Sequence, residues 1–274
     1  MNSKKDFSDW LLASDIDGTL NNKMRRLPKR NKEAIERFIE NGGKFTLASG
    51  RNPQSMEKHF RNLPIKNTPA VVINGAGLYD FEKNEMIYFS AMNNTAMNLA
   101  VECAERFPLV DCLIVAKDLI YITGNGWFGK IFVASDNLKH KHFKDIKDVP
   151  RENWGKVVFS GLPHHIKKIK KHFTDLDSSD LTLMSSSIAS FELLAADTHK
   201  GTAVLKLAEI LGIDKAHTAA IGDYFNDYDM LKSVGVPACC GQAPKEMKNI
   251  SEFTACHCNK GAVADFIEYL ELNK

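Results

Sequence analysis

The sequence predicts an α/β protein with a doubly wound parallel sheet, into which a smaller α+β domain is inserted. Towards both ends of the chain, short apolar runs alternate with amphipathic segments of helical period. Each apolar run ends at small or acidic residues, as expected for strands whose carboxyl ends share one edge of a parallel sheet. Between residues 83 and 187 this alternation gives way to strand patterns and two helical patterns.

Composition excludes several classes of protein. The chain has 274 residues, and its 44% hydrophobic and 26% charged residues are typical of a folded water-soluble protein. A net charge of +2 argues against a dedicated nucleic-acid binder. The N-terminus is polar and no apolar run approaches the about 18 residues that span a bilayer, so we expect a cytoplasmic protein without membrane contacts. For the six cysteines we expect free thiols, with zinc at Cys256-His257-Cys258 as the weaker alternative.

The N-terminal part of the predicted core covers residues 1–82. Its expected elements are a strand at Trp10–Ala13, a helix at Pro28–Asn41, a strand at Lys44–Ala48, a helix at Pro53–Arg61 and a strand at Ala70–Ile73. Pro28 suits the first turn of a helix, and Gly42-Gly43 suits its end. Strands linked in this way by helices wind into a parallel sheet through right-handed crossovers.

The predicted insertion covers residues 83–187. Its expected elements are strands at Met86–Phe89, Leu113–Val115 and Leu119–Thr123, and helices at Thr95–Arg106 and His164–Phe173. The lysines of the last helix are interpreted as a solvated face, with anion binding as an alternative. The glycine-bounded loop at 124–129 carries two aromatic residues that either face a substrate or pack on this domain.

The C-terminal part of the core covers residues 188–274. His199-Lys200-Gly201 opens a helix whose apolar positions recur at helical spacing. A strand at Thr218–Ile221, a helix at Tyr228–Val234, a strand at Val236–Cys240 and a final helix with Val263, Phe266, Ile267 and Leu270 in register complete the predicted elements.

Reactive side chains stand at the ends of these elements. They are Asp15, Asp17, Ser49, Lys200, Asp223 and Asp227. In a parallel sheet the strand-borne groups converge at one edge, and a helix can deliver the lysine to the same edge. Several acids with one lysine and one hydroxyl suit phosphoryl transfer, because Mg²⁺ needs oxygen ligands and phosphoryl oxygens need cations and donors. Each residue alone could instead be a turn, a cap or a surface residue; their joint occurrence favours a site.

Four motifs, in this order and spacing, resemble those of the haloacid dehalogenase (HAD) superfamily phosphatases. They are DIDGTL at 15–20, LASGR at 47–51, Lys200 at a helix start and GDYFND at 222–227. NGAG at 74–77 and the long insertion resemble the Cof-type branch, whose members carry a type 2 cap. The resemblance implies a Rossmann-like HAD core at 1–82 and 188–274 and a cap, the substrate specificity domain, at 83–187.

The resemblance also implies roles in catalysis. Asp15 would be the nucleophile that forms an aspartyl-phosphate, and Asp17 would act as general acid and then base. Lys200 would neutralise charge on the nucleophile and the phosphoryl group. The metal would be held by Asp15, the backbone carbonyl of Asp17, and Asp223, while Asp227 orients its shell.

Phosphate contacts are implied for a second group of residues. Ser49 and Gly50 would hold phosphoryl oxygens and Asn226 could contact phosphate, whereas Arg51 and Asn74 would reach the substrate or brace their loops. Two departures from the family pattern stand out: Ser49 replaces the commoner threonine, and Gly241-Gln242-Ala243 replaces Gly-Asn-Ala.

The predicted function is a Mg²⁺-dependent phosphatase that hydrolyses phosphomonoesters of small metabolites, with sugar phosphates as the expected class. A monomer is compatible with the sequence. Two alternatives stay open. One is a phosphomutase or phosphotransferase that passes the phosphoryl group to a sugar hydroxyl, and the other is a non-catalytic phospho-aspartate switch.

Overall fold

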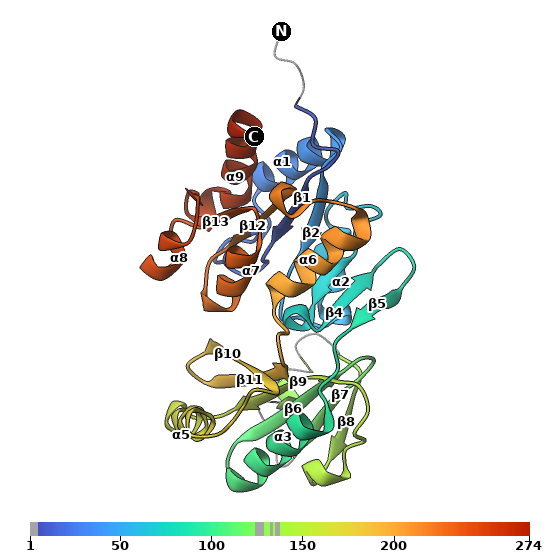
Figure 1. Ribbon diagram of the computed structural model, residues 1–274, viewed down its shortest axis with the longest axis vertical. Helices are drawn as coiled ribbons and strands as arrows, with labels where there is room; N and C mark the ends of the chain where they lie inside the picture. The colour runs from blue at the N-terminus through green and yellow to red at the C-terminus, as the bar shows by residue number, and fades with distance from the viewer. Residues whose placement is uncertain (1–4, 124–128, 132–133, 135–137) are drawn as a thin grey trace. The chain divides into compact units, whose positions relative to one another are not determined.

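The computed structural model describes residues 5–123, 129–131, 134 and 138–274 (Figure 1). The chain forms two compact units. One takes the chain up to Arg51 and adds Met56–Ile87 and Lys200–Lys274, and the other comprises Asn52–Ser55 and Tyr88–His199. The sequence-based boundaries at 82/83 and 187/188 stay predictions. Residues 124–128 of the predicted aromatic loop lie outside the described residues.

The first unit is built on a five-stranded sheet in the order β14-β13-β12-β1-β2, with every pair parallel. Its strands are β1 (Leu11–Ser14), β2 (Lys44–Leu47), β12 (Thr218–Gly222), β13 (Val236–Cys239) and β14 (Phe253–Thr254). β1 is buried along its whole length, which its unbroken apolar run predicts for a strand covered on both faces. The predicted parallel α/β core is confirmed.

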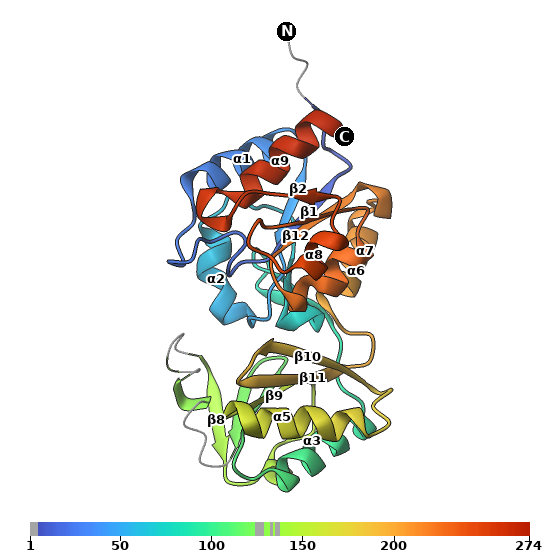
Figure 2. The same ribbon diagram turned by 90° about the vertical axis from the view of Figure 1, so that its left-hand side faces the viewer.

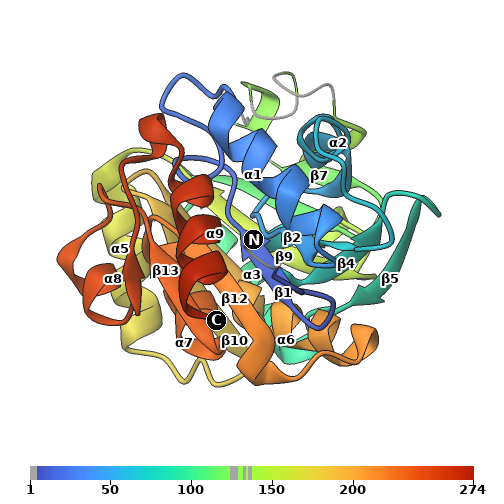
Figure 3. The ribbon, with the colours of Figure 1, turned by 90° about the horizontal axis from the view of Figure 1, so that it is seen from above.

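Helices cover both faces of this sheet. They are α1 (Lys29–Glu40), α2 (Pro53–Arg61), α6 (Lys200–Leu211), α7 (Tyr228–Ser233), α8 (Lys245–Asn249) and α9 (Ala262–Asn273). α1 and α9 pack side by side on one face, and α6 packs against α7 on the other (Figure 3). α1 turns Ala34, Ile35 and Phe38 inward, as its helical periodicity predicts.

The third predicted strand ends earlier than expected. β3 (Ala70–Val72) meets Ala48 through a parallel bridge and pairs with β4 (Gly77–Asp80), which is followed by β5 (Glu85–Phe89). Ile73, predicted as strand, instead opens a short 3₁₀ turn, and both Ile73 and Asn74 have positive φ, +53° and +54°. The backbone turns here, which the apolar character of Ile73 did not indicate.

The second unit is a six-stranded sheet in the order β10-β11-β9-β6-β7-β8, antiparallel except for the β7–β8 pair. Its strands are β6 (Asp111–Ala116), β7 (Ile120–Thr123), β8 (His140–Phe143), β9 (Trp154–Ser160), β10 (Leu181–Ser187) and β11 (Ser190–Ala195). The predicted α+β character is confirmed. β8, β9, β10 and β11 were not predicted; β8 is polar and mostly exposed, which leaves no apolar alternation to detect.

Two helices, α3 (Asn94–Arg106) and α5 (Pro163–Thr174), cover one face of this second sheet (Figure 2). Ile166, Ile169 and Phe173 of α5 pack there in a core with strand residues such as Val157 and Leu193. β11 pairs with β9 and β10, so the strand that precedes Lys200 belongs to this sheet. In neither unit does a described helix combine the length and the apolar character needed to cross a membrane.

Candidate active site

Asp15 and Asp223 come together because β1 and β12 are neighbouring parallel strands. Ser14 pairs with Ile221 in the register of the two strands, and the N–H of Asp15 donates to the Ile221 carbonyl at 3.1 Å. The residue that follows each strand therefore emerges at the same edge of the sheet. Residues more than 200 positions apart in the sequence thus become neighbours.

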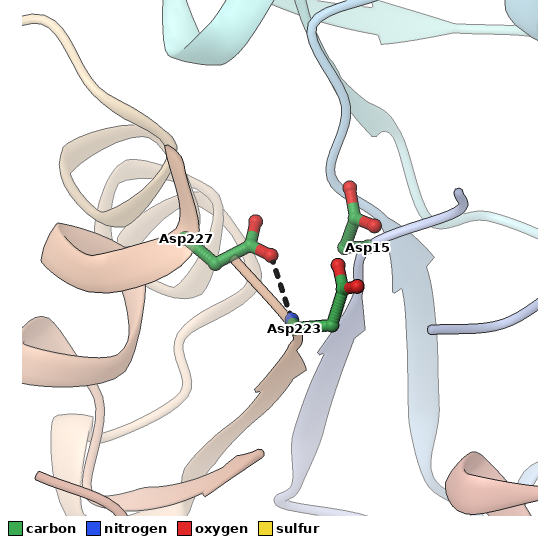
Figure 4. Close-up of side chains that lie close together, drawn as sticks. All are labelled: Asp15, Asp223 and Asp227. Carbon is green, nitrogen blue, oxygen red and sulfur yellow. Dashed lines mark hydrogen bonds between the residues drawn. The ribbon is translucent and has the colours of Figure 1, made fainter. Parts of the chain in front are cut away.

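Three carboxylates, from Asp15, Asp223 and Asp227, gather at this edge (Figure 4). One oxygen from each lies within 4.8 Å of the others, and the side chains of Asp15 and Asp227 are buried. Such an all-oxygen set fits a hard divalent cation such as Mg²⁺. The carboxylate of Asp17 is not part of this group, so its predicted metal contact through the backbone carbonyl stays a prediction.

Lys200 joins two of these carboxylates. It is the first residue of α6 and is fully buried, and its Nζ donates to Asp15 Oδ1 at 2.7 Å and to Asp227 Oδ1 at 2.6 Å. The other oxygen of Asp227 accepts the N–H of Asp223 at 3.0 Å, the dashed line of Figure 4. Asp227 therefore braces both the lysine and the backbone that carries Asp223.

Burial of so many like charges shifts their proton affinities. Burial raises the pKa of Asp15 to about 8 against the opposing effect of Lys200, and Asp227 adds to the rise. Burial also raises the pKa of Asp223 to about 6, again with a contribution from Asp227. The pKa of Lys200 is raised, because the two carboxylates outweigh the effect of its burial. Negative charge in excess of one ammonium is therefore unfavourable here, and a bound cation would relieve it.

Asp17 lies on the exposed side of the same loop. Its side chain is 45% exposed, and its Oδ2 accepts from Nε and Nη2 of Arg51 at 3.0 and 2.9 Å. The loop after β2 thus reaches the loop after β1 through a charge-assisted pair. Arg51 thus contacts Asp17 across the two loops, and its predicted contact with the substrate stays a prediction.

The remaining predicted residues lie at the ends of β2 and β3. Ser49 is buried, its carbonyl accepts the N–H of Asn74 at 2.9 Å, and its own N–H donates to Val71 at 3.0 Å. A side chain at Gly50 would place Cβ 2.8 Å from the Asn74 amide oxygen, so the two loops are in close contact. Asn226 lies half-buried in the 3₁₀ turn Phe225–Asp227, one residue before Asp227.

Two glycines allow the carboxylates to approach the backbone. Gly18 has a φ of +88°, and a Cβ there would lie 2.4 Å from Asp223 Oδ2. A Cβ at Gly222 would lie 2.5 Å from Asp227 Oδ2. Glycine is therefore required at Gly18 both by its conformation and by space, and at Gly222 by space alone.

Gln242 is a site residue that the sequence did not predict. It follows β13, and its Nε2 donates to the Gly18 carbonyl at 2.6 Å while its Oε1 accepts the N–H of Cys258 at 3.0 Å. The only signal was the Gly241-Gln242-Ala243 motif with glutamine in place of the commoner asparagine.

Comparison with known proteins shows similarity over nearly the whole chain. A family model described as haloacid dehalogenase-like hydrolase matches residues 12–267. Phosphatase YwpJ of Bacillus subtilis is 26% identical over 293 residues, which cover 95% of this chain and 99% of that protein. HMP-PP phosphatase of Serratia proteamaculans is 23% identical over 268 residues, which cover 94% of each chain.

The fold is also similar to that of a solved structure, described as the HAD subclass IIB sugar phosphatase BT4131. The TM-score is 0.80 at 21% sequence identity, and the match covers 95% of this chain and 98% of that one. The agreement confirms the α/β core with a separate second sheet. Together with the family match over nearly the whole sequence, it shows that the protein belongs to the haloacid dehalogenase-like hydrolases, in their Cof-type phosphatase branch.

Proposed function

We propose that the protein is a Mg²⁺-dependent phosphatase that hydrolyses phosphomonoesters of small metabolites through an aspartyl-phosphate at Asp15. The observation that carries this proposal is the buried Asp15 carboxylate, held by Lys200 and adjoining Asp223 and Asp227 at the end of the parallel sheet. A carboxylate fixed by a cation and shielded from water is a suitable nucleophile for phosphorus.

In the first step a carboxylate oxygen of Asp15 attacks phosphorus, and the bond from phosphorus to the leaving oxygen breaks. Asp17 gives its proton to that oxygen, so the alcohol leaves neutral. In the second step Asp17 takes a proton from water as the water oxygen attacks phosphorus. The bond between phosphorus and Asp15 then breaks, which releases inorganic phosphate and restores the Asp15 carboxylate and the protonated carboxyl of Asp17.

Charge is stabilised by groups already in place. Lys200 contacts Asp15 directly. Its ammonium would also neutralise negative charge on the transferred phosphoryl group. Ser49, Gly50, Asn74 and Asn226 are the proposed phosphate contacts. Asp15, Asp223 and the backbone carbonyl of Asp17 would hold Mg²⁺, with Asp227 orienting that shell. Bound Mg²⁺ would supply positive charge opposite the phosphoryl oxygens.

Sugar phosphates are the substrate class we propose. The similarity to a sugar phosphatase structure supports this class, while the similarity to HMP-PP phosphatase shows that related chains differ in substrate. We propose the second unit as the cap that selects the leaving group, with residues 83–187 as its sequence-based limits. Related proteins can differ in substrate because they share the reaction chemistry of the core, while a separate domain selects the substrate.

The test is phosphate release from a panel of phosphorylated sugars, polyols, nucleotides and cofactors, with and without Mg²⁺. For Asp15→Asn we expect a loss of about 10³-fold or more with the fold retained, because an amide cannot form the acyl phosphate. The matched control is Asp9→Asn, before the other end of β1, where the side chain is 59% exposed and pairs with His217. Undiminished release by Asp15→Asn would contradict the mechanism.

A further inference from the structure

Gln242 connects three segments that are far apart in the sequence. The loop after β1 contributes the Gly18 carbonyl, the turn after β13 contributes Gln242 itself, and the 3₁₀ turn at Cys258–Lys260 contributes the Cys258 N–H. The Gln242 amide thus donates to the backbone of one loop and accepts from the backbone of another. A side chain that bridges two loops restrains the distance between them.

The Gly18 end of this bridge lies directly against the proposed metal site. Because a Cβ at Gly18 would lie 2.4 Å from Asp223 Oδ2, the Gly18 backbone and the Asp223 carboxylate are in close contact. Gly18 is also bonded to Asp17, whose carbonyl is a proposed metal ligand. A small displacement of the Gly18 carbonyl would therefore change the spacing of two ligand groups.

Gln242 acts at the place where the loop after β1 meets the end of β12. The carbonyl that it holds belongs to Gly18, whose backbone is in close contact with the Asp223 carboxylate. One amide therefore restrains the backbone on which the Asp223 side chain packs.

The turn that carries Gln242 is itself held in place. The N–H of Gly241 donates to the Cys256 carbonyl at 3.1 Å, and a Cβ at Gly241 would lie 2.9 Å from the Ala255 carbonyl oxygen. The backbone at this point is therefore tied to the segment that contains Ala255 and Cys256. An asparagine, which is one methylene shorter, could not keep both bonds from this backbone position.

We propose that Gln242 is a positioning residue for the reaction: it sets the spacing between the loop after β1 and Asp223, and thereby the affinity of the site for Mg²⁺. It acts through Gly18 and Asp223 and does not touch the substrate. This inference rests on the proposed function, which assigns a metal to these carboxylates. Groups that orient metal ligands in this way typically change metal affinity by about 10- to 100-fold.

The experiment compares Gln242→Met with Lys248→Met. Methionine has nearly the length of glutamine but neither donates nor accepts the amide's hydrogen bonds. Lys248 is exposed and donates to the Gly241 carbonyl at 2.8 Å, so its replacement removes a bond from the same turn without affecting Gly18 or Asp223. Two quantities are measured: the Mg²⁺ concentration that gives half-maximal phosphate release, and the rise of Tm with Mg²⁺ in the absence of substrate.

For Gln242→Met we expect the half-saturating Mg²⁺ concentration to rise by about 10-fold and the Mg²⁺ titration of Tm to shift by a similar factor. kcat at limiting Mg²⁺ should fall, while the substrate KM at saturating Mg²⁺ stays within about twofold. Lys248→Met should match the wild type in all of these. An unchanged Mg²⁺ requirement, an equal change in Lys248→Met, or a change in KM alone would each overturn the inference.

Two further outcomes are distinguishable. If circular dichroism shows that Gln242→Met does not fold, Gln242→Asn is measured instead, since it keeps an amide. A rise of about threefold or more in its half-saturating Mg²⁺ concentration supports the inference. No rise overturns the inference. If the wild type binds Mg²⁺ by thermal shift but releases no phosphate, the proposed function fails and the positioning role is still tested by Tm. If the wild type shows neither, both fail together.

Discussion

Gly18 and Gly212 both have a positive φ, +88° and +70°, but differ in what surrounds them. A Cβ at Gly18 would lie 2.4 Å from Asp223 Oδ2, whereas a Cβ at Gly212 would have no atom within 4 Å. Replacement by alanine therefore imposes backbone strain at both positions and a collision at only one. Comparison of the two alanine variants therefore distinguishes the effect of backbone strain from the effect of a collision with Asp223.

For Gly18→Ala we expect phosphate release to fall by about 100-fold, because displacement of Asp223 or of the loop after β1 disturbs the reacting groups. Gly212→Ala should lose about 1 kcal/mol of stability from its left-handed backbone and keep its activity. Urea unfolding and steady-state kinetics of both variants measure the two effects. Equal activities in the two variants would show that the contact with Asp223 has no catalytic consequence.

Among the elements, α6 determines how the lysine enters the site. A Cβ at Gly201 would lie 2.6 Å from the Asp229 carbonyl and 2.4 Å from Ser233 Oγ, so α6 packs unusually closely on α7. This packing brings the first residue of the helix, Lys200, to the carboxylates. The position of α6 therefore determines where the Lys200 ammonium lies.

Lys200→Met should leave the two buried carboxylates without their cation and destabilise the fold by about 3 kcal/mol at pH 9.5 in EDTA. Burial raises the pKa of Asp15 to about 8 even with Lys200 present, so its removal raises the folded-state pKa further. A folded-state pKa above the unfolded value means that the folded protein binds the proton more tightly, so stability is gained as the pH falls. The difference between the two proteins arises above the wild-type pKa of about 8, so the deficit should shrink as the pH falls from 9.5 to 7.5.

Urea unfolding at the two pH values measures this effect. The control is Lys206→Met on the same helix, where the side chain is 42% exposed and pairs with Glu209. Its stability should stay within about 0.5 kcal/mol of the wild type at both pH values. A pH-independent deficit in Lys200→Met would mean that lost packing, not uncompensated charge, is the cause.

For the whole molecule, we expect metal binding to stabilise the fold. The three carboxylates of Asp15, Asp223 and Asp227 oppose one another in the folded protein, and the unfolded chain has no such cluster. Mg²⁺ at 100 times its dissociation constant should stabilise the fold by about 2.7 kcal/mol. We expect a rise in Tm of about 5 °C that EDTA reverses.

Differential scanning calorimetry with Mg²⁺, with EDTA, and with NaCl at equal ionic strength measures this shift. Asp223→Asn should reduce it, since one ligand oxygen loses its charge. The same rise with NaCl would assign the effect to screening of the carboxylates and not to a bound ion.

The amino-acid sequence by itself determined the parallel core, because unbroken apolar runs ending in Asp15, Ser49 and Asp223 identify both the strands and the edge at which they end. The spacing of the motifs also identified the family. The strands β8 and β9 were missed, since β8 is polar and mostly exposed and β9 pairs with β6, which is distant in sequence. The local hairpin of β10 and β11 was also missed.

Only the tertiary structure decided which oxygen and nitrogen atoms meet. Lys200 bridges Asp15 and Asp227, Arg51 pairs with Asp17, and Gln242 reaches Gly18 across 224 positions of the chain. The local sequence pattern indicates only whether a residue at a strand end is apolar or polar. Hydrogen bonds require distances of about 3 Å, and strand register and helix packing determine these distances. The sequence therefore determined which types of reactive residue are present, and the fold determined which of them are in contact.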